Sequence, residues 1–130
     1  MNRQIPSLVE TYIQAGFPSP ADDAVETPLD LHTLMVKKPA ATFFIRVEGD
    51  SMQGAGIYNQ DLLVVDRSIS HVENKVVVAR INQEFTVKRL IKENDRYVLL
   101  PENPKYQPIL ITEDMDFEIW GVVTFAIHAL

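Results

Sequence analysis

From Thr42 onward, short apolar runs alternate with polar breaks along the chain. The runs are rich in Val, Ile, Phe and Tyr, and they read TFFIRVE, DLLVVD, KVVVARI, EFTVKRL, RYVLL, PILIT and FEIWGVVTFAIH. Closely spaced runs of β-branched and aromatic residues are typical of antiparallel strands. The pattern therefore predicts a mostly β fold, with a small twisted antiparallel β domain over residues 42–130.

Two of the polar breaks have the residue types of tight turns. Asn82 and Gln83 separate KVVVARI from EFTVKRL, and KENDR separates EFTVKRL from RYVLL. Asn and Asp tolerate the left-handed backbone that hairpin turns require. We expect a turn at each of these two places.

Residues 1–41 follow a different pattern. Five of the eight prolines lie there, interleaved with Asp and Glu, and proline disfavours long helices and strands. In SLVETYIQ, Ser7 and Glu10 have the spacing of a helix capping box, which predicts one or two helical turns before Gly16. The remainder of this proline-rich N-terminal arm is expected to be extended.

Composition limits the kinds of function that the chain can have. Its 130 residues suit one compact domain, and its net charge of -6 opposes the attraction that draws basic proteins to nucleic acid. The absence of cysteine excludes disulfides, Cys metal sites and a thiol nucleophile. No run approaches the roughly 18 apolar residues of a membrane span, and the N-terminus lacks the apolar core of a signal peptide, so we expect no membrane association and a cytoplasmic location.

Ser51, in EGDSMQGAG, is a candidate nucleophile that requires a base. None of the three histidines, His32, His71 and His128, lies in a site-like context. Lys88 lies within EFTVKRL, where strand alternation places it on one face with Thr86 and Leu90. Desolvation there would lower its pKa and leave it able to accept a proton. Taken singly, a GDS turn and a strand lysine are more often structural than catalytic.

The motifs taken together are more specific. GDSM, GI, DLLVVD, EFTVKRL, PENPKYQPI and GVV, in that order, resemble the LexA/UmuD family of self-cleaving Ser-Lys proteases over nearly the whole chain. In the arm, GFPSPADDAVE followed by LDL is similar to the arm of UmuD-like members. The 37 residues from Ser51 to Lys88 also match that family.

The resemblance implies roles for five residues. Ser51 corresponds to the nucleophile, Lys88 to the general base, and the bond to be cut joins Ala15 to Gly16. The backbone N–H of Met52 is expected to help hold the oxyanion. Small residues on both sides of the bond suit a narrow cleft. No cofactor and no metal is implied.

The sequence departs from the family pattern in two places. Gln60 precedes Asp61 in YNQDLL where many relatives have Gly, and the segment before the scissile bond is short. Neither departure involves Ser51 or Lys88. They concern the shape of one turn and the efficiency of cleavage.

The resemblance also implies a role and partners. Removing 15 of the 130 residues leaves 115, and in UmuD-like proteins the shortened homodimer joins a UmuC-like Y-family polymerase in error-prone translesion synthesis. A RecA filament on single-stranded DNA triggers the cut in the bacterial SOS response. LexA-type repressors carry a helix-turn-helix domain ahead of the scissile bond, whereas only fifteen residues precede Gly16 here. We therefore expect no direct sequence-specific DNA binding.

Two alternatives come from other functional classes. One is a non-cleaving dimeric regulatory module with a vestigial protease site, and the other is a peptidase that acts on other proteins. The presence of both Ser51 and Lys88 argues against the first. A tethered Ala-Gly bond argues against the second.

Overall fold

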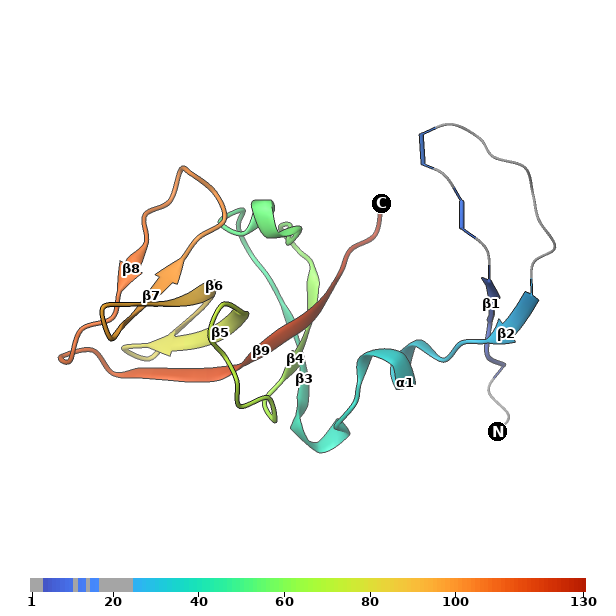
Figure 1. Ribbon diagram of the computed structural model, residues 1–130, viewed down its shortest axis with the longest axis horizontal. Coiled ribbons are helices and arrows are strands. Elements are labelled where there is room, and N and C mark those ends of the chain that lie inside the picture. Colours follow the sequence, from blue (N-terminus) through green and yellow to red (C-terminus); the bar gives the residue numbers. More distant parts are fainter. Residues whose placement is uncertain (1–3, 11, 14, 17–24) are drawn as a thin grey trace. The chain divides into compact units, whose positions relative to one another are not determined.

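The computed structural model describes residues 4–10, 12–13, 15–16 and 25–130 (Figure 1). The chain forms two compact units, Met1–Leu34 and Met35–Leu130. The main sheet begins at Thr42, after the short helix η1 (Pro39–Ala41). The proline-rich stretch 17–24 of the predicted arm lies outside the described residues.

The second unit is built on one seven-stranded sheet, in which all neighbouring strands are antiparallel. This confirms the predicted mostly β fold. Across the sheet, the order is β3 (Thr42–Arg46), β4 (Leu62–Asp66), β9 (Phe117–Ile127), β5 (Val76–Ile81), β6 (Glu84–Glu93), β7 (Arg96–Leu100) and β8 (Ile109–Leu110).

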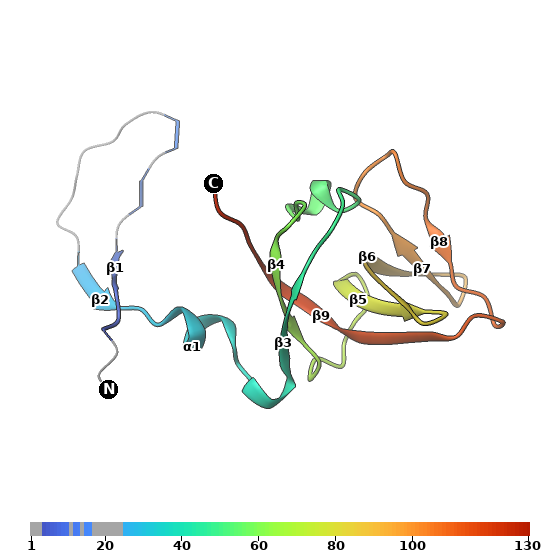
Figure 2. The same cartoon turned by 180° about the vertical axis from the view of Figure 1, so that it is seen from behind.

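The long strand β9 joins the two halves of the sheet (Figure 1, Figure 2). Its first half pairs with β5 and its second half with β4, and a register shift interrupts each pairing. Such bulges bend a strand and increase its twist. Gly121 lies beside one shift, where an added Cβ would stand 2.6 Å from Val65 Cγ1. The sheet can therefore coil tightly around this point.

Both predicted turns are present and both use left-handed backbone. Asn82 and Gln83 have φ of 48° and 74° between β5 and β6, and Asn94 and Asp95 have φ of 52° and 64° between β6 and β7. Consecutive positive φ angles match the twist of paired strands. The prediction of a turn at each place is confirmed.

Two apolar clusters make up the core. The first contains Met52, Ile57, Leu63, Val65 and Val78, and the second contains Val77, Ala79, Leu90, Leu99 and Val122. Neighbouring residues of β5 thus belong to different clusters, because successive side chains of a strand point to opposite faces. Burial on both faces explains the continuous apolar run of β5.

The first unit contains a small hairpin in place of the helical turns predicted over SLVETYIQ. Strand β1 (Ser7–Glu10) pairs antiparallel with β2 (Val25–Pro28) in four residue pairs. The helix prediction is wrong because an isolated helix of so few residues is marginal, and β-branched residues such as Val9 and Val25 favour strand pairing.

The expected extended structure is also interrupted after β2, where the chain forms the one-turn helix α1 (Leu31–Met35). Asp30 begins this helix, since its carboxylate accepts hydrogen bonds from the His32 N–H at 3.1 Å and from the Thr33 hydroxyl at 3.3 Å. An Asp directly before Leu31 was the sequence signal for this helix.

Candidate active site

Ser51 lies on the turn between β3 and β4, two residues before the short helix η2 (Gln53–Ala55). Gly49 enters the turn with φ of 99°, a backbone conformation that favours glycine. Met52 follows Ser51, and its side chain is only 2% exposed within the first core cluster. The buried methionine fixes one side of the turn and leaves Ser51 at the surface of the core.

Lys88 reaches Ser51 from β6, a strand paired on both sides. Its Nζ lies 3.1 Å from Ser51 Oγ, within hydrogen-bond distance. The same nitrogen donates to Thr86 Oγ1 at 2.7 Å and to the Val87 carbonyl oxygen at 3.1 Å. Two residues that are 37 positions apart in the sequence therefore meet.

The surroundings of Lys88 favour its neutral form. Burial lowers the pKa of the Lys88 amine, because an ammonium loses solvation when water is excluded. A neutral amine has two N–H donors and one lone pair. With the donors directed at Thr86 and Val87, the lone pair can accept the Ser51 hydroxyl proton. The spacing of Thr86 and Lys88 on one strand face was the only sequence signal for the contribution of Thr86.

Ser51 and Lys88 open into a cleft of about 340 Å³. One side comes from the end of β3 and the residues that follow it, and the other from the first half of β6. Its lining residues are Ile45, Arg46, Val47, Glu48, Gly49, Ser51, Met52, Val78, Phe85, Thr86, Val87 and Lys88. The cleft offers space for an extended segment of chain beside the two residues.

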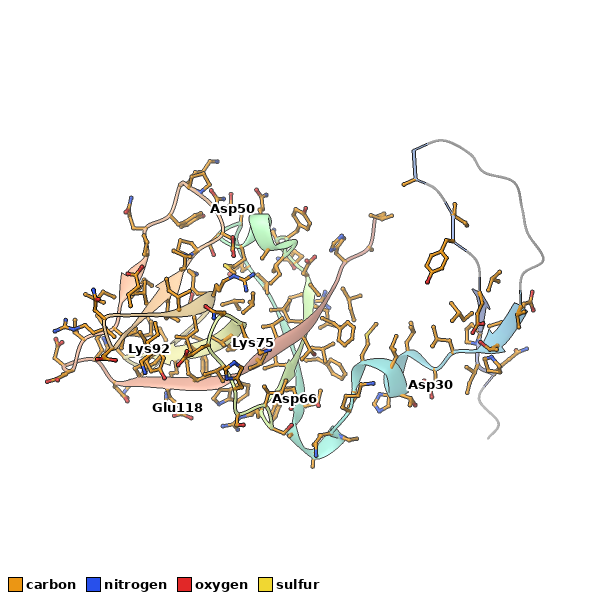
Figure 3. The ribbon with its side chains drawn as sticks, in the orientation of Figure 1. Asp30, Asp50, Asp66, Lys75, Lys92 and Glu118 are labelled. Carbon is orange, nitrogen blue, oxygen red and sulfur yellow. The ribbon has the colours of Figure 1, made fainter. Side chains whose placement is uncertain are left out.

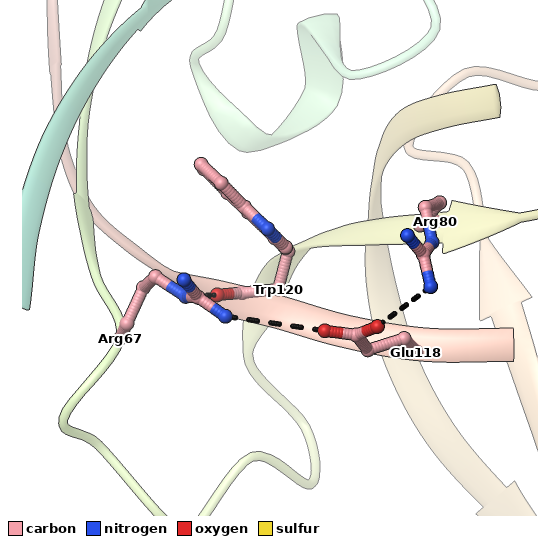
Figure 4. A network of polar contacts seen from close by, with 4 residues as sticks. All are labelled: Arg67, Arg80, Glu118 and Trp120. Carbon is pink, nitrogen blue, oxygen red and sulfur yellow. Dashed lines mark hydrogen bonds and ion pairs between the residues drawn. The ribbon is translucent and has the colours of Figure 1, made fainter. Parts of the chain in front are cut away.

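An aromatic and charged network supports the Phe85 side of the cleft. The Trp120 ring lies 5.6 Å from the Phe85 ring, between centroids, and the Arg67 guanidinium lies 4.7 Å from the Trp120 centroid. Arg67 Nε donates to the Trp120 carbonyl oxygen at 2.8 Å (Figure 4). Glu118 pairs with Arg67 at 3.9 Å and with Arg80 at 2.8 Å.

The other predicted site residues lie in different places. Among the described residues, the Met52 backbone N–H makes no hydrogen bond, which leaves it free to donate. Ala15 and Gly16 belong to the first unit, where both are exposed and an added Cβ at Gly16 would meet no atom within 4 Å.

Neither His71 nor His128, the two histidines of the second unit, lines the cleft. His32 lies on α1 and His71 is exposed. His128 Nδ1 lies 3.2 Å from Oδ2 of the buried Asp61.

A family model described as Peptidase S24-like matches residues 7–124 of the chain. The chain belongs to this family. It is 48% identical over 114 residues to Protein SamA of Salmonella typhimurium and 46% identical over 116 residues to Protein MucA of Escherichia coli. Each alignment covers 88% of this chain and 79% of the relative. The predicted UmuD-like membership of the LexA/UmuD family is confirmed.

The chain is also similar to LexA repressor 2 of Pseudomonas syringae, with 41% identity over 111 residues. That alignment covers 85% of this chain and 54% of the repressor, so the chain spans about half of its length. Membership of the Peptidase S24-like family places the chain among serine proteases of the LexA/UmuD type.

In this Peptidase S24-like chain, the departure at Gln60 has a visible structural consequence. Gln60 adopts φ of 73°, a conformation that costs a non-glycine residue about 1–2 kcal/mol. Its N–H donates to the Val47 carbonyl oxygen at 2.7 Å, and its own carbonyl oxygen accepts from Arg46 Nη1 at 2.9 Å. The turn thus keeps the backbone of a glycine turn without the glycine.

In the described part of the chain, no helix is both long and apolar enough to cross a bilayer. The same residues contain no cluster of three or more His, Asp or Glu side chains arranged to hold a metal ion.

Proposed function

We propose that the chain is a self-cleaving serine protease of the UmuD type that cuts its own bond between Ala15 and Gly16. Ser51 is the nucleophile and Lys88 the general base. The observation that carries the proposal is the 3.1 Å approach of Lys88 Nζ to Ser51 Oγ within a cleft of a Peptidase S24-like chain. Residues 1–41 form the arm that carries the substrate, and residues 42–130 form the protease and dimerisation domain.

The chemistry follows from a neutral Lys88 amine beside the Ser51 hydroxyl. Neutral Lys88 takes the proton of the Ser51 hydroxyl as Oγ attacks the Ala15 carbonyl carbon, and the Met52 N–H donates to the resulting oxyanion. The Lys88 ammonium then protonates the leaving Gly16 amine as the peptide bond breaks. A water molecule then attacks the acyl ester as Lys88 takes its proton, and the Lys88 ammonium returns a proton to Ser51 Oγ as the ester bond breaks.

The cellular role proposed here is that of UmuD-like proteins in SOS mutagenesis. The 45–48% identity to SamA, MucA and ImpA over 88% of the chain supports it. The partners would be a second copy of the chain, a UmuC-like Y-family polymerase and a RecA filament on single-stranded DNA in the bacterial cytoplasm. A filament that stabilised the docked arm would speed cleavage by population shift alone.

A vestigial site in a purely regulatory dimer is the second candidate. A vestigial site would not need a neutral Lys88 amine directed at Ser51. In this chain, burial lowers the pKa of Lys88, and its Nζ has three hydrogen-bond partners. The self-cleaving function accounts for these features directly.

The deciding experiment is incubation of the purified chain with an activated RecA filament, followed by intact mass. Removal of 15 residues should leave a 115-residue product that begins at Gly16. Ser51→Ala and Lys88→Ala should each abolish this product, because nucleophile and base act as one unit. Gly16→Glu should also block it by bringing bulk and charge to a narrow cleft.

The chain offers a matched control for each of the two residues. Lys92→Ala changes an exposed lysine of the same strand, and Ser70→Ala changes an exposed serine outside the cleft. Both should cleave at the unsubstituted rate. A product from Ser51→Ala or Lys88→Ala would remove that residue from the mechanism, and a first residue other than Gly16 would move the scissile bond.

A further inference from the structure

Two loops meet around Ser51. We call residues 49–56 the nucleophile turn and residues 101–106, which follow β7, the brace loop. Among the described residues, the first backbone hydrogen bond within the nucleophile turn comes at the start of η2, where the Gln53 N–H donates to the Asp50 carbonyl oxygen at 3.3 Å. The brace loop contacts its backbone on both sides of Ser51.

Backbone hydrogen bonds join the two loops directly. The Glu102 N–H donates to the Ser51 carbonyl oxygen at 2.9 Å, and the Gly54 N–H donates to the Glu102 carbonyl oxygen at 2.8 Å. The second contact requires glycine, because an added Cβ at Gly54 would stand 2.7 Å from the Glu102 oxygen. The nucleophile turn is therefore shaped to receive the brace loop.

Asp50, the residue before Ser51, receives two further hydrogen bonds from side chains of the brace loop. Asn103 Nδ2 donates to the Asp50 backbone oxygen at 2.9 Å, and the Tyr106 hydroxyl donates to the Asp50 carboxylate. Figure 3 labels Asp50 next to η2. Both the backbone and the side chain of Asp50 are thus held by the same loop.

The brace loop is in turn held by the strand that carries Lys88. Arg89 follows Lys88 on β6, and its Nε lies 2.6 Å from Glu102 Oε1. The Arg89 Nη1 also donates to the Asn74 carbonyl oxygen at 2.7 Å. A continuous series of ion-paired and hydrogen-bonded groups therefore runs from Arg89 on β6 through Glu102 to Ser51.

From these contacts we propose that the brace loop positions Ser51 against Lys88, and that Tyr106, acting through Asp50, is a positioning residue for cleavage. The proposal rests on the proposed self-cleavage for its reaction. Proton transfer requires Ser51 Oγ to stay within hydrogen-bond reach of Lys88 Nζ. A misplacement of about 1 Å can lower a rate by about 100-fold.

Tyr106 is suited to this task at the pH where the reaction should run. The hydrogen bond to Asp50 and its negative charge raise the pKa of Tyr106 above its usual value near 10. The hydroxyl therefore keeps its proton in alkaline solution, where Lys88 becomes neutral. The donor to Asp50 persists while the base is active.

The test compares four variants in filament-stimulated cleavage. Tyr106→Phe removes the hydroxyl and should lower the rate by about 10- to 100-fold. Asp50→Ala should do the same, while Asp50→Asn keeps an acceptor oxygen and should retain most of the rate. The double variant Tyr106→Phe with Asp50→Ala should be no slower than either single variant, because the two side chains act through one hydrogen bond.

Two readouts separate positioning from other roles. The apparent pKa in the pH profile should be the same for Tyr106→Phe and the unsubstituted chain, because no charge near Lys88 has changed. The backbone amide of Glu102 should exchange with solvent faster in Tyr106→Phe. Tyr58→Phe is the matched control, since Tyr58 is 44% exposed against 43% for Tyr106 and its hydroxyl makes no hydrogen bond among the described residues.

The outcomes distinguish this proposal from the proposed function. Unchanged cleavage in Tyr106→Phe, or an Asp50→Asn variant as slow as Asp50→Ala, would overturn the positioning role while self-cleavage stood. If the unsubstituted chain never cleaves, the proposed function fails. Amide exchange at Glu102 then still tests whether Tyr106 holds the brace loop against the nucleophile turn. In either case, an unchanged exchange rate at Glu102 in Tyr106→Phe would overturn the proposed role of Tyr106.

Discussion

At the scale of single residues, the candidate site depends on where the Lys88 amine resides. A lysine in bulk water titrates near 10.4 and is almost entirely protonated at neutral pH. Burial between β3 and β6 lowers the pKa of Lys88, and Thr86 and Val87 hold the amine toward Ser51. The fold thus supplies both the desolvation and the direction that a lysine base requires.

The first residue-scale prediction is a rise of cleavage rate with pH. Only neutral Lys88 can accept the Ser51 proton, so the rate without filament should increase through a pKa below 10.4. Docking of the arm would exclude more water and lower that pKa further. With the filament, the rise should therefore occur at lower pH. Single-turnover rates between about pH 6 and 10 measure both profiles.

A histidine base would give a different profile, levelling off soon after pH 7 because imidazole is already neutral there. The folded state must be verified by circular dichroism at each pH. A filament-free rate that stayed flat between about pH 7.5 and 10 would exclude Lys88 as the base.

At the scale of elements, β9 determines how the sheet coils. It pairs with β5 and with β4, and the register shifts at Val78 and Val64 let one strand serve both. Gly121 lies where β9 passes close to the Val65 side chain. Because β9 lies between β4 and β5, it separates the β3–β4 pair, whose connecting turn carries Ser51, from the β5–β6 pair, which carries Lys88.

We predict that Gly121→Ala lowers the free energy of unfolding by about 1–3 kcal/mol through overpacking. The added Cβ would stand 2.6 Å from Val65 Cγ1 and 3.4 Å from the Asp66 carbonyl oxygen. Urea denaturation measures the change. In a Val65→Ala background the same substitution should cost less, because the clashing methyl is absent. An equal cost in both backgrounds would mean that the clash is not the cause.

Cleavage between Ala15 and Gly16 would also affect the β1–β2 hairpin. The bond proposed for cleavage, between Ala15 and Gly16, lies in the connection between the two strands, so a cut there would leave them paired but no longer covalently joined. Hydrolysis therefore replaces intramolecular pairing, with its high effective concentration, by pairing between separate molecules. An isolated two-stranded hairpin is marginally stable even when intact.

We therefore predict that residues 1–15 dissociate from the processed chain at micromolar concentration. Native mass spectrometry after cleavage should show the 115-residue product without the peptide. The Ser51→Ala chain serves as the uncut control. A stable one-to-one complex of peptide and product would show that the strand pairing alone holds the arm in place.

At the scale of the whole molecule, the sheet has two edges beside which the described residues place no further strand. The outer strands are β3 and β8, of which β8 has two residues and β3 has five. On β3, Phe44 is 53% exposed. An exposed edge with apolar side chains favours pairing with another chain.

We predict that the full-length chain is mainly a homodimer, since a second copy can cover such an edge by closed twofold symmetry. Light scattering at micromolar concentration measures the mass. A monomer under those conditions would contradict the prediction.

The sequence alone determined the features that depend on near neighbours. The β class follows from runs such as VVVA, and the turns at Asn82 and Asn94 follow from residues that tolerate positive φ. Each depends on the preferences of a few adjacent residues. The residue pattern made Ser51 and Lys88 candidates, and the resemblance to a family favoured their catalytic role over a structural one.

Only the tertiary structure decided which distant residues meet. The approach of Lys88 to Ser51 across 37 positions depends on how β9 bends the sheet, and the contact of Tyr106 with Asp50 spans 56 positions. The pairing of β1 with β2 likewise replaced a local helix signal by a partner 15 or more residues away. Such contacts depend on the register and coiling of the whole sheet, and a short window of sequence carries no information about either.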